Sequence, residues 1–162
     1  MDEVWSYDFI ATRTQDGGPL RILNVVDEYT RRAMACHAAR HIGAAQVLAE
    51  LERLFGAHGK PRFLRSDNGR EFTAESTIAW LAGQGVTPIF IERGSPQQNP
   101  FVERFNGTMR DELLNGEHFH NVLEARVVLA DWVRQYNTLR PHRGLGYKTP
   151  MAFYEASRVG RP

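Results

Sequence analysis

Three carboxylates in this sequence, Asp8, Asp67 and Glu103, occupy positions that ordinary surface charges do not explain well. Asp8 interrupts Val4–Ala11 (VWSYDFIA), an apolar run with aromatic and β-branched residues that predicts a strand. An isolated acid of this kind usually faces solvent at a strand edge. The aromatic flanks favour instead a place inside a sheet, where an ionised carboxylate needs a partner.

Asp67 and Glu103 each have a structural interpretation beside the chemical one. Asp67 follows Arg62–Ser66 and opens an Asp-Asn-Gly sequence, which favours a turn without any function. The ends of strands are also where α/β folds place reactive groups. Glu103 shares a helical stripe with Arg110, roughly 100° from the apolar stripe of the same helix. Such a stripe is usually solvated; alternatively, the helix crosses the sheet and directs Glu103 at the two aspartates.

The chemistry that three converging carboxylates can perform depends on a cation. Brought together they repel one another, which raises their pKa values unless a positive charge neutralises them. Oxygen ligands suit Mg²⁺ or Mn²⁺, which keep coordination positions for water and phosphate. Two such ions about 4 Å apart can activate an attacking water or hydroxyl and stabilise the leaving oxygen of a phosphodiester. We therefore expect a site for two divalent ions, and without metal we expect Glu103 to turn away.

The elements that must position these acids follow from the hydrophobic periodicity of the chain. The predicted order is strands over 4–11, 21–27 and 33–39, a helix from 43 to 58, a strand over 62–66, a helix over 74–84, a strand over 86–91, and helices over 99–114 and 122–136. The first three strands are expected to form an antiparallel meander, and Asn99 with Pro100 predicts the start of a helix. This order matches a ribonuclease-H-like α/β fold, a five-stranded mixed sheet flanked by helices.

Composition narrows the class of protein without identifying a partner. A hydrophobic fraction of 42% and a charged fraction of 24% are typical of a globular domain. The single cysteine, Cys36, excludes an internal disulfide and a cysteine-based zinc site, and we interpret His118 and His120 as surface residues. No apolar run is long enough to cross a bilayer and the first residues do not resemble a signal peptide, so we expect a cytoplasmic protein.

The net charge of +1 is weak support for a polyanionic partner. Basic residues nevertheless gather in 62–70, 104–110 and 134–148. A basic face and a set of ordinary solvated charges are equally consistent with this distribution.

Five motifs resemble the integrase-core transposases of bacterial insertion sequences (the orfB type), which are relatives of retroviral integrases. They are WSYDF (5–9), VDEYTRR (26–32), SDNGREF (66–72), SPQQNPFVERFNGTMRDEL (95–113) and YNTLRPHRGLGYKTP (136–150). Thirty-five residues separate Asp67 from Glu103, the spacing of the D,D(35)E subgroup. Each motif alone is weak, but five in this order are specific. The resemblance covers residues 5–150, and we expect a catalytic core over 1–150 and a C-terminal tail over 151–162.

The resemblance implies roles for individual residues. Asp8, Asp67 and Glu103 would be the catalytic, metal-binding triad. Arg110 stands where the family usually has a lysine that contacts DNA, so the charge is kept and the geometry of the contact differs. Asp27 is interpreted as structural, and for Pro141 and His142 packing is favoured over DNA binding. The residues expected at DNA are Asn68, Gln97, Asn99, Asn106 and Arg110.

The resemblance also implies partners: DNA, as transposon ends and target, further copies of the chain on that DNA, and an upstream helix-turn-helix domain or protein. The chain would then be either an excised core or the product of a split element. The expected activity is metal-dependent cleavage and strand transfer with Mg²⁺ or Mn²⁺. Two other functions remain open, a non-catalytic DNA-binding or assembly remnant of a mobile element and a ribonuclease-H-like nuclease.

Overall fold

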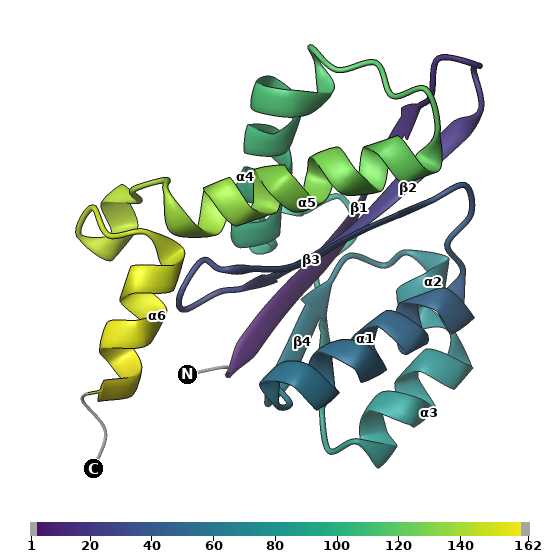
Figure 1. Ribbon diagram of the computed structural model, residues 1–162. Helices are drawn as coiled ribbons and strands as arrows, with labels where there is room; N and C mark the ends of the chain where they lie inside the picture. Colours follow the sequence, from purple (N-terminus) through teal and green to yellow (C-terminus); the bar gives the residue numbers. More distant parts are fainter. Residues whose placement is uncertain (1–2, 160–162) are drawn as a thin grey trace.

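A five-stranded mixed sheet runs through the molecule, with helices on both faces (Figure 1). The computed structural model describes residues 3–159. Its elements in chain order are β1 (Val4–Arg13), β2 (Pro19–Asp27), β3 (Ala33–Ala39), α1 (Ala44–His58), β4 (Phe63–Ser66), α2 (Arg70–Thr73), α3 (Glu75–Gly83), β5 (Thr87–Phe90), the 3₁₀ turn η1 (Pro96–Gln98), α4 (Pro100–Met109), the π-helical turn η2 (Arg110–Leu114), α5 (Val122–Thr138), the 3₁₀ turn η3 (Arg143–Leu145) and α6 (Pro150–Val159). None of these helices is long and apolar enough to span a membrane.

The sheet has the strand order β3-β2-β1-β4-β5, so β1 is the central strand. Strands β1, β2 and β3 form the expected antiparallel meander, and β4 and β5 run parallel to β1. In the β1–β2 register Asp8 lies opposite Asn24. Because side chains alternate between the two faces of a strand, Trp5 and Tyr7 point to one face and Asp8 and Ile10 to the other.

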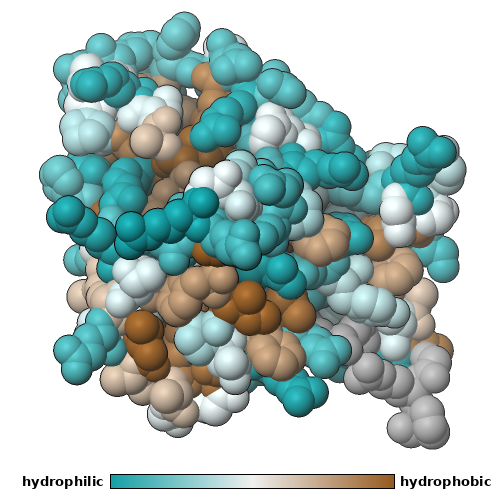
Figure 2. Space-filling view, turned by 180° about the vertical axis from the view of Figure 1, so that it is seen from behind, coloured by the Kyte–Doolittle hydropathy of each residue, from teal (hydrophilic) through white to brown (hydrophobic). Residues whose placement is uncertain are grey.

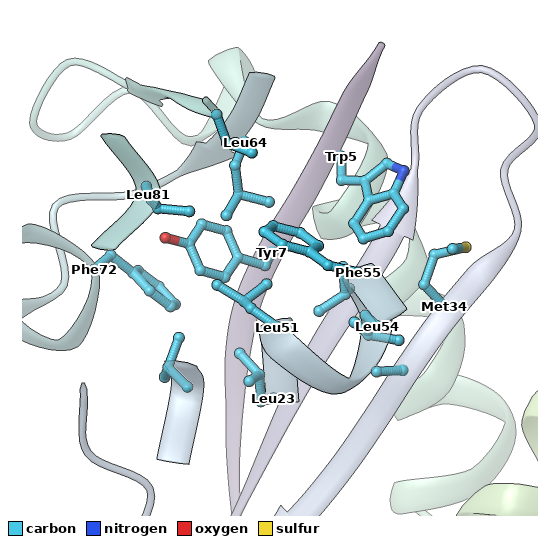
Figure 3. Close-up of a cluster of buried hydrophobic side chains, with 14 of the residues drawn as sticks. Trp5, Tyr7, Leu23, Met34, Leu51, Leu54, Phe55, Leu64, Phe72 and Leu81 are labelled. Atoms are coloured by element: carbon cyan, nitrogen blue, oxygen red, sulfur yellow. The ribbon is translucent and has the colours of Figure 1, made fainter. Parts of the chain in front are cut away.

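The face that carries Trp5 and Tyr7 is covered by α1, α2 and α3. Trp5 packs against Phe55 with ring centroids 5.8 Å apart, and Tyr7 packs against Phe72 at 4.1 Å (Figure 3). Leu64 completes this side of the core and is fully buried. This cluster packs against one face of β1, and α4 and α5 cover the opposite face of the sheet.

The face that carries Asp8 is covered by α4 and α5, which lie together on one side of the sheet in Figure 1. Val102, Phe105 and Met109 are buried in α4 and pack in a cluster with Ile10 of β1. The predicted apolar stripe of this helix is therefore its core face. Seen from behind (Figure 2), the upper part of the surface is mainly hydrophilic and the lower part is mixed.

The C-terminal tail predicted over 151–162 is helical in the part that the structure describes. Residues 150–159 form α6, which packs on α5 (Figure 1), while 160–162 lie outside the described residues. Thr149 caps the helix, since its hydroxyl accepts a hydrogen bond from the backbone N–H of Ala152, and Pro150 follows as the first helical residue. Phe153 packs against Tyr29 in a tilted arrangement with ring centroids 5.4 Å apart, so aromatic packing holds the helix in place.

Candidate active site

The three acids singled out from the sequence line one cavity of about 500 Å³. Asp8 lies in the middle of β1, Asp67 follows β4, and Glu103 lies in the first turn of α4. Strands β1 and β4 are parallel neighbours, which brings Asp67 to the same region of the sheet as Asp8. Helix α4 packs on β1 and supplies Glu103 to the lining of the same cavity.

The carboxyl group of Asp8 is destabilised in its charged form. Burial raises its pKa to about 6, and the negative charges of Asp67 and Glu103 act in the same direction. The backbone N–H of Phe9 and the positive charge of Arg110 oppose this increase. The protein therefore holds an excess of negative charge at this cavity that a cation would neutralise.

Two buried amides fix the orientation of Asp8. Asn106 donates a hydrogen bond from Nδ2 to Asp8 Oδ2 at 2.8 Å, and Asn24 donates from Nδ2 to Asn106 Oδ1 at 2.7 Å. Asn24 is fully buried and Asn106 is 2% exposed. Asn24 was not predicted as a site residue from the sequence, although a polar residue within the apolar strand β2 is a signal that could have indicated it.

Asp67 forms the turn that its sequence predicts and also lines the cavity. Its Oδ1 accepts a hydrogen bond of 2.8 Å from the backbone N–H of Gly69, as the Asp-Asn-Gly sequence predicts for a turn. Asn68 donates from Nδ2 to the carbonyl oxygen of Ile91 at 2.6 Å, which ties this turn to the loop after β5. The turn thus holds Asp67 at the edge of the cavity while the carboxylate stays half-buried.

The donor set fits a hard divalent cation, because carboxylate oxygens are the ligands that Mg²⁺ and Mn²⁺ prefer. Within residues 3–159, however, no three His, Cys, Asp or Glu side chains are arranged as a metal site. Asp8, Asp67 and Glu103 share the cavity without converging on one point. Their mutual repulsion, visible in the raised pKa of Asp8, gives a physical reason for carboxylates to stay apart when no cation lies between them.

The residues expected at DNA lie in different environments. Asn68 and Asn99 line the cavity, and Arg110 is exposed at the start of η2. Gln97 is exposed on η1 and is not among the residues that line the cavity. The prediction that Asn106 contacts DNA is wrong. Its side chain is buried and hydrogen-bonded to Asp8, so it is not available to DNA.

Asn99 departs from its expected capping role. It occupies the N-cap position of α4, but its side chain makes no capping hydrogen bond. The residue is 2% exposed, and its Oδ1 atom has no hydrogen-bond partner among the described residues. A buried acceptor without a donor destabilises the protein, and here it lies beside the cavity of the three acids.

The structure agrees with the interpretations of Asp27 and His142 made outside the triad, but not with packing for Pro141. The Asp27 carboxylate is fully buried and accepts hydrogen bonds from the backbone N–H and the hydroxyl of Thr30, which makes it a structural turn residue. His142 packs edge-on against Tyr136, with ring centroids 4.9 Å apart. Pro141 is exposed.

The fold, with its three acids around one cavity, is consistent with an integrase-type core, and comparison with known sequences shows this family. One model of the integrase core domain matches residues 1–96, and a second model with the same description matches residues 84–150. The chain belongs to the integrase core domain family. Asp8 and Asp67 fall within the first match and Glu103 within the second.

The similar curated proteins come from bacterial insertion elements. An uncharacterized 39.2 kDa protein of IS476 from Xanthomonas euvesicatoria is 40% identical over 94% of this chain and 44% of its own length. An uncharacterized 31.7 kDa protein of IS407 from Burkholderia multivorans is 38% identical over 98% of this chain and 57% of its own length. The transposase of IS904 from Lactococcus lactis is 26% identical over 94% of this chain and 61% of its own length. The chain spans about half the length of the first two relatives.

A solved structure confirms the predicted fold. The catalytic core domain of HTLV-2 integrase, in complex with magnesium, superposes with a TM-score of 0.73 over 94% of this chain and 95% of that chain. The two sequences are 15% identical, so the likeness shows a shared fold. That fold is the ribonuclease-H-like fold of integrase catalytic cores.

Proposed function

We propose that this chain is the catalytic core of a DDE-type transposase that cleaves DNA and joins transposon ends to a target. The observation that carries the proposal is that Asp8, Asp67 and Glu103, from three separate parts of the fold, line the same cavity. The similarity to insertion-element proteins, one of them named as a transposase, supports DNA as the substrate.

Asp8, Asp67 and Glu103 would hold one or two Mg²⁺ or Mn²⁺ ions. Bound metal would supply Lewis-acid stabilisation of the phosphate and a lowered pKa for an attacking water or 3′-hydroxyl. The chain itself orients the ligands, since Asn24 and Asn106 hold Asp8 and the turn at Gly69 holds Asp67. Arg110 places a positive charge near Asp8, where a phosphate would carry negative charge.

A strand-cleavage assay tests this proposal. With short labelled DNA ends and Mg²⁺ or Mn²⁺, the chain is expected to cut and join strands, and Asp67→Asn to abolish both reactions without loss of DNA affinity. Asp131→Asn is the matched control, since Asp131 is an exposed aspartate on α5 that pairs with Arg134 at 2.7 Å. Equal cleavage by Asp67→Asn and the wild type would contradict the catalytic assignment.

The same assay distinguishes the proposed transposase from the two other functions that the sequence left open. Cleavage of RNA–DNA hybrids in preference to duplex DNA would identify a ribonuclease-H-like nuclease. DNA binding with no metal-dependent cleavage of either substrate would identify a non-catalytic assembly module. The transposase proposal further includes multimers of the chain on DNA, an upstream helix-turn-helix domain or protein, and action in the bacterial cytoplasm.

A further inference from the structure

A second cavity, of about 260 Å³, lies on the other side of α4 from the acidic cavity. Its lining residues are Val26, Arg31, Pro100, Phe101, Arg104, Phe105, Thr108, Tyr136, Arg140, His142, Arg143 and Gly144. Phe101, Arg104 and Thr108 follow each other at spacings of three and four residues and form one stripe of the helix. At about 100° per residue, this stripe faces roughly opposite to Glu103.

The cavity carries a strong excess of positive charge. Four arginines and one histidine line it, and no carboxylate does among the described residues. Arg140 pairs with Glu112 outside the lining. Within residues 3–159, Arg104 and Arg143 form no ion pair. Like charges gathered around a small cavity repel, so the cavity favours an anion.

Two polar side-chain atoms at this cavity have no hydrogen-bond partner among the described residues. Arg140 Nη1 and His142 Nε2 are both buried and make no hydrogen bond to any described residue. Burial lowers the pKa of His142, and the charges of Arg140 and Arg31 lower it further. Donors that are buried and unpaired destabilise a protein unless a ligand satisfies them.

Arg31 is constrained at the edge of the same cavity. Its φ of 62° is in the left-handed region, which a residue with a side chain adopts at a cost. Its guanidinium lies 3.8 Å from the centroid of the Phe101 ring. Burial lowers the pKa of Arg31, the negative charge of Glu28 opposes this decrease, and the charge of Arg104 adds to it. The backbone thus holds a cation against α4, close to another cation.

We propose that this cavity binds a backbone phosphate of the DNA strand whose reacting phosphate lies at Asp8, Asp67 and Glu103. The inference rests on the proposed function and adds a second phosphate site to it. Guanidinium groups bind phosphate with paired hydrogen bonds, and neutral His142 adds one further polar contact. Helix α4 is about 10–12 Å wide with its side chains, and this width corresponds to about three nucleotides of one strand at 3.4 Å each.

DNA binding by the full chain in Ca²⁺, without cleavage, tests this site. Fluorescein-labelled duplex DNA with a short single-stranded end is titrated at several salt concentrations and followed by anisotropy. Arg104→Gln combined with Arg143→Gln is expected to weaken binding about tenfold and to reduce the slope of log affinity against log salt by about two. Arg143→Gln alone, remote in sequence from the acids, is expected to reduce the slope by about one.

Arg62→Gln is the matched control, because Arg62 is an exposed arginine at the opposite end of β4 from Asp67. Arg62→Gln should leave affinity and slope unchanged. An equal loss in the control, or no loss in the cavity variants, overturns the proposal. Displacement of DNA by polyglutamate at equal charge concentration also overturns it, in favour of an acidic protein partner.

Inorganic phosphate distinguishes a DNA phosphate from a free one. If calorimetry detects phosphate binding that the double variant loses while the DNA salt slopes stay parallel, the cavity is a small-anion site and the DNA proposal fails. Because these are binding measurements, they stay informative if cleavage is absent. If the wild type does not cleave DNA but the arginine variants still weaken DNA binding as expected, the proposed function is contradicted and the second phosphate site is not.

Discussion

Asn106 donates a 2.8 Å hydrogen bond to Asp8 although the two residues lie 98 positions apart in the chain. The donor is buried in α4 and the acceptor lies on the central strand, so the bond couples the helix that carries Glu103 to the strand that carries Asp8. Asn24 in turn donates to Asn106 and fixes the direction of its amide.

Asn106→Ala is expected to weaken Mn²⁺ binding about 10–100-fold, as loss of residues that orient metal ligands commonly does. It should also lower the free energy of unfolding by about 1–3 kcal/mol, because the amide of Asn24 loses its acceptor. Electron paramagnetic resonance titration of Mn²⁺ measures the first effect and urea unfolding the second. A destabilised variant with wild-type Mn²⁺ affinity would show that Asn106 has a structural role only.

Asp8→Asn is expected to remove a pH dependence of stability. The pKa of Asp8 in the folded protein, about 6, lies above its ordinary value of 3.8, so the folded state binds more protons between these pH values. The free energy of unfolding should therefore fall as the pH rises through about 6. The shift corresponds to roughly 3 kcal/mol for a fully buried group, and partial exposure reduces this to about 1–2 kcal/mol.

Urea unfolding at pH 5 and pH 7.5 measures this effect in wild type and Asp8→Asn. The variant should gain stability relative to wild type at pH 7.5, and added Mg²⁺ should raise the stability of the wild type alone by binding its folded state. If the difference in free energy of unfolding between wild type and Asp8→Asn is the same at both pH values, the charged form of Asp8 does not destabilise the folded protein.

Arg110→Ala is expected to weaken binding to different DNA sequences equally and to reduce the salt slope by about one, because a phosphate contact carries no sequence information. Arg110→Lys should keep most of the wild-type affinity and salt slope, since the positive charge is retained. Anisotropy titrations in Ca²⁺ at several salt concentrations provide the measurement. Identical lines for Arg110→Ala and wild type would leave Arg110 as a solvated surface charge.

Tyr154→Ala is expected to release α6 from the domain. The guanidinium of Arg32, which is 5% exposed, lies 3.9 Å from the centroid of the Tyr154 ring. Loss of this cation–π contact and of the ring burial should lower the free energy of unfolding by about 1–3 kcal/mol. Tyr154→Phe should retain most of the stability. Thermal unfolding measures both, and an unchanged midpoint in Tyr154→Ala would mean that α6 contributes little.

The sequence by itself determined the order of the elements and the faces that they bury. Alternation in β1 separates Trp5 and Tyr7 from Asp8, and the spacing of Val102, Phe105 and Met109 defines the core stripe of α4, because both patterns are local consequences of backbone geometry. The short helix α2 and the longer helix α6 were not predicted. For α6 the Thr149-Pro150 start was present, but the aromatic contacts that hold the helix come from distant parts of the chain.

The tertiary structure alone decided which side chains meet. From the sequence of its helix, Asn106 was expected to contact DNA. In the structure its amide is buried, because it is hydrogen-bonded to Asn24 and Asp8 on neighbouring strands. The four arginines of the second cavity come from three separate segments: Arg31 precedes β3, Arg104 lies in α4, and Arg140 and Arg143 follow α5. A local pattern could therefore not indicate that all four share one cavity. Periodicity specifies one face of one element, whereas a site depends on how faces from several elements are brought together in space.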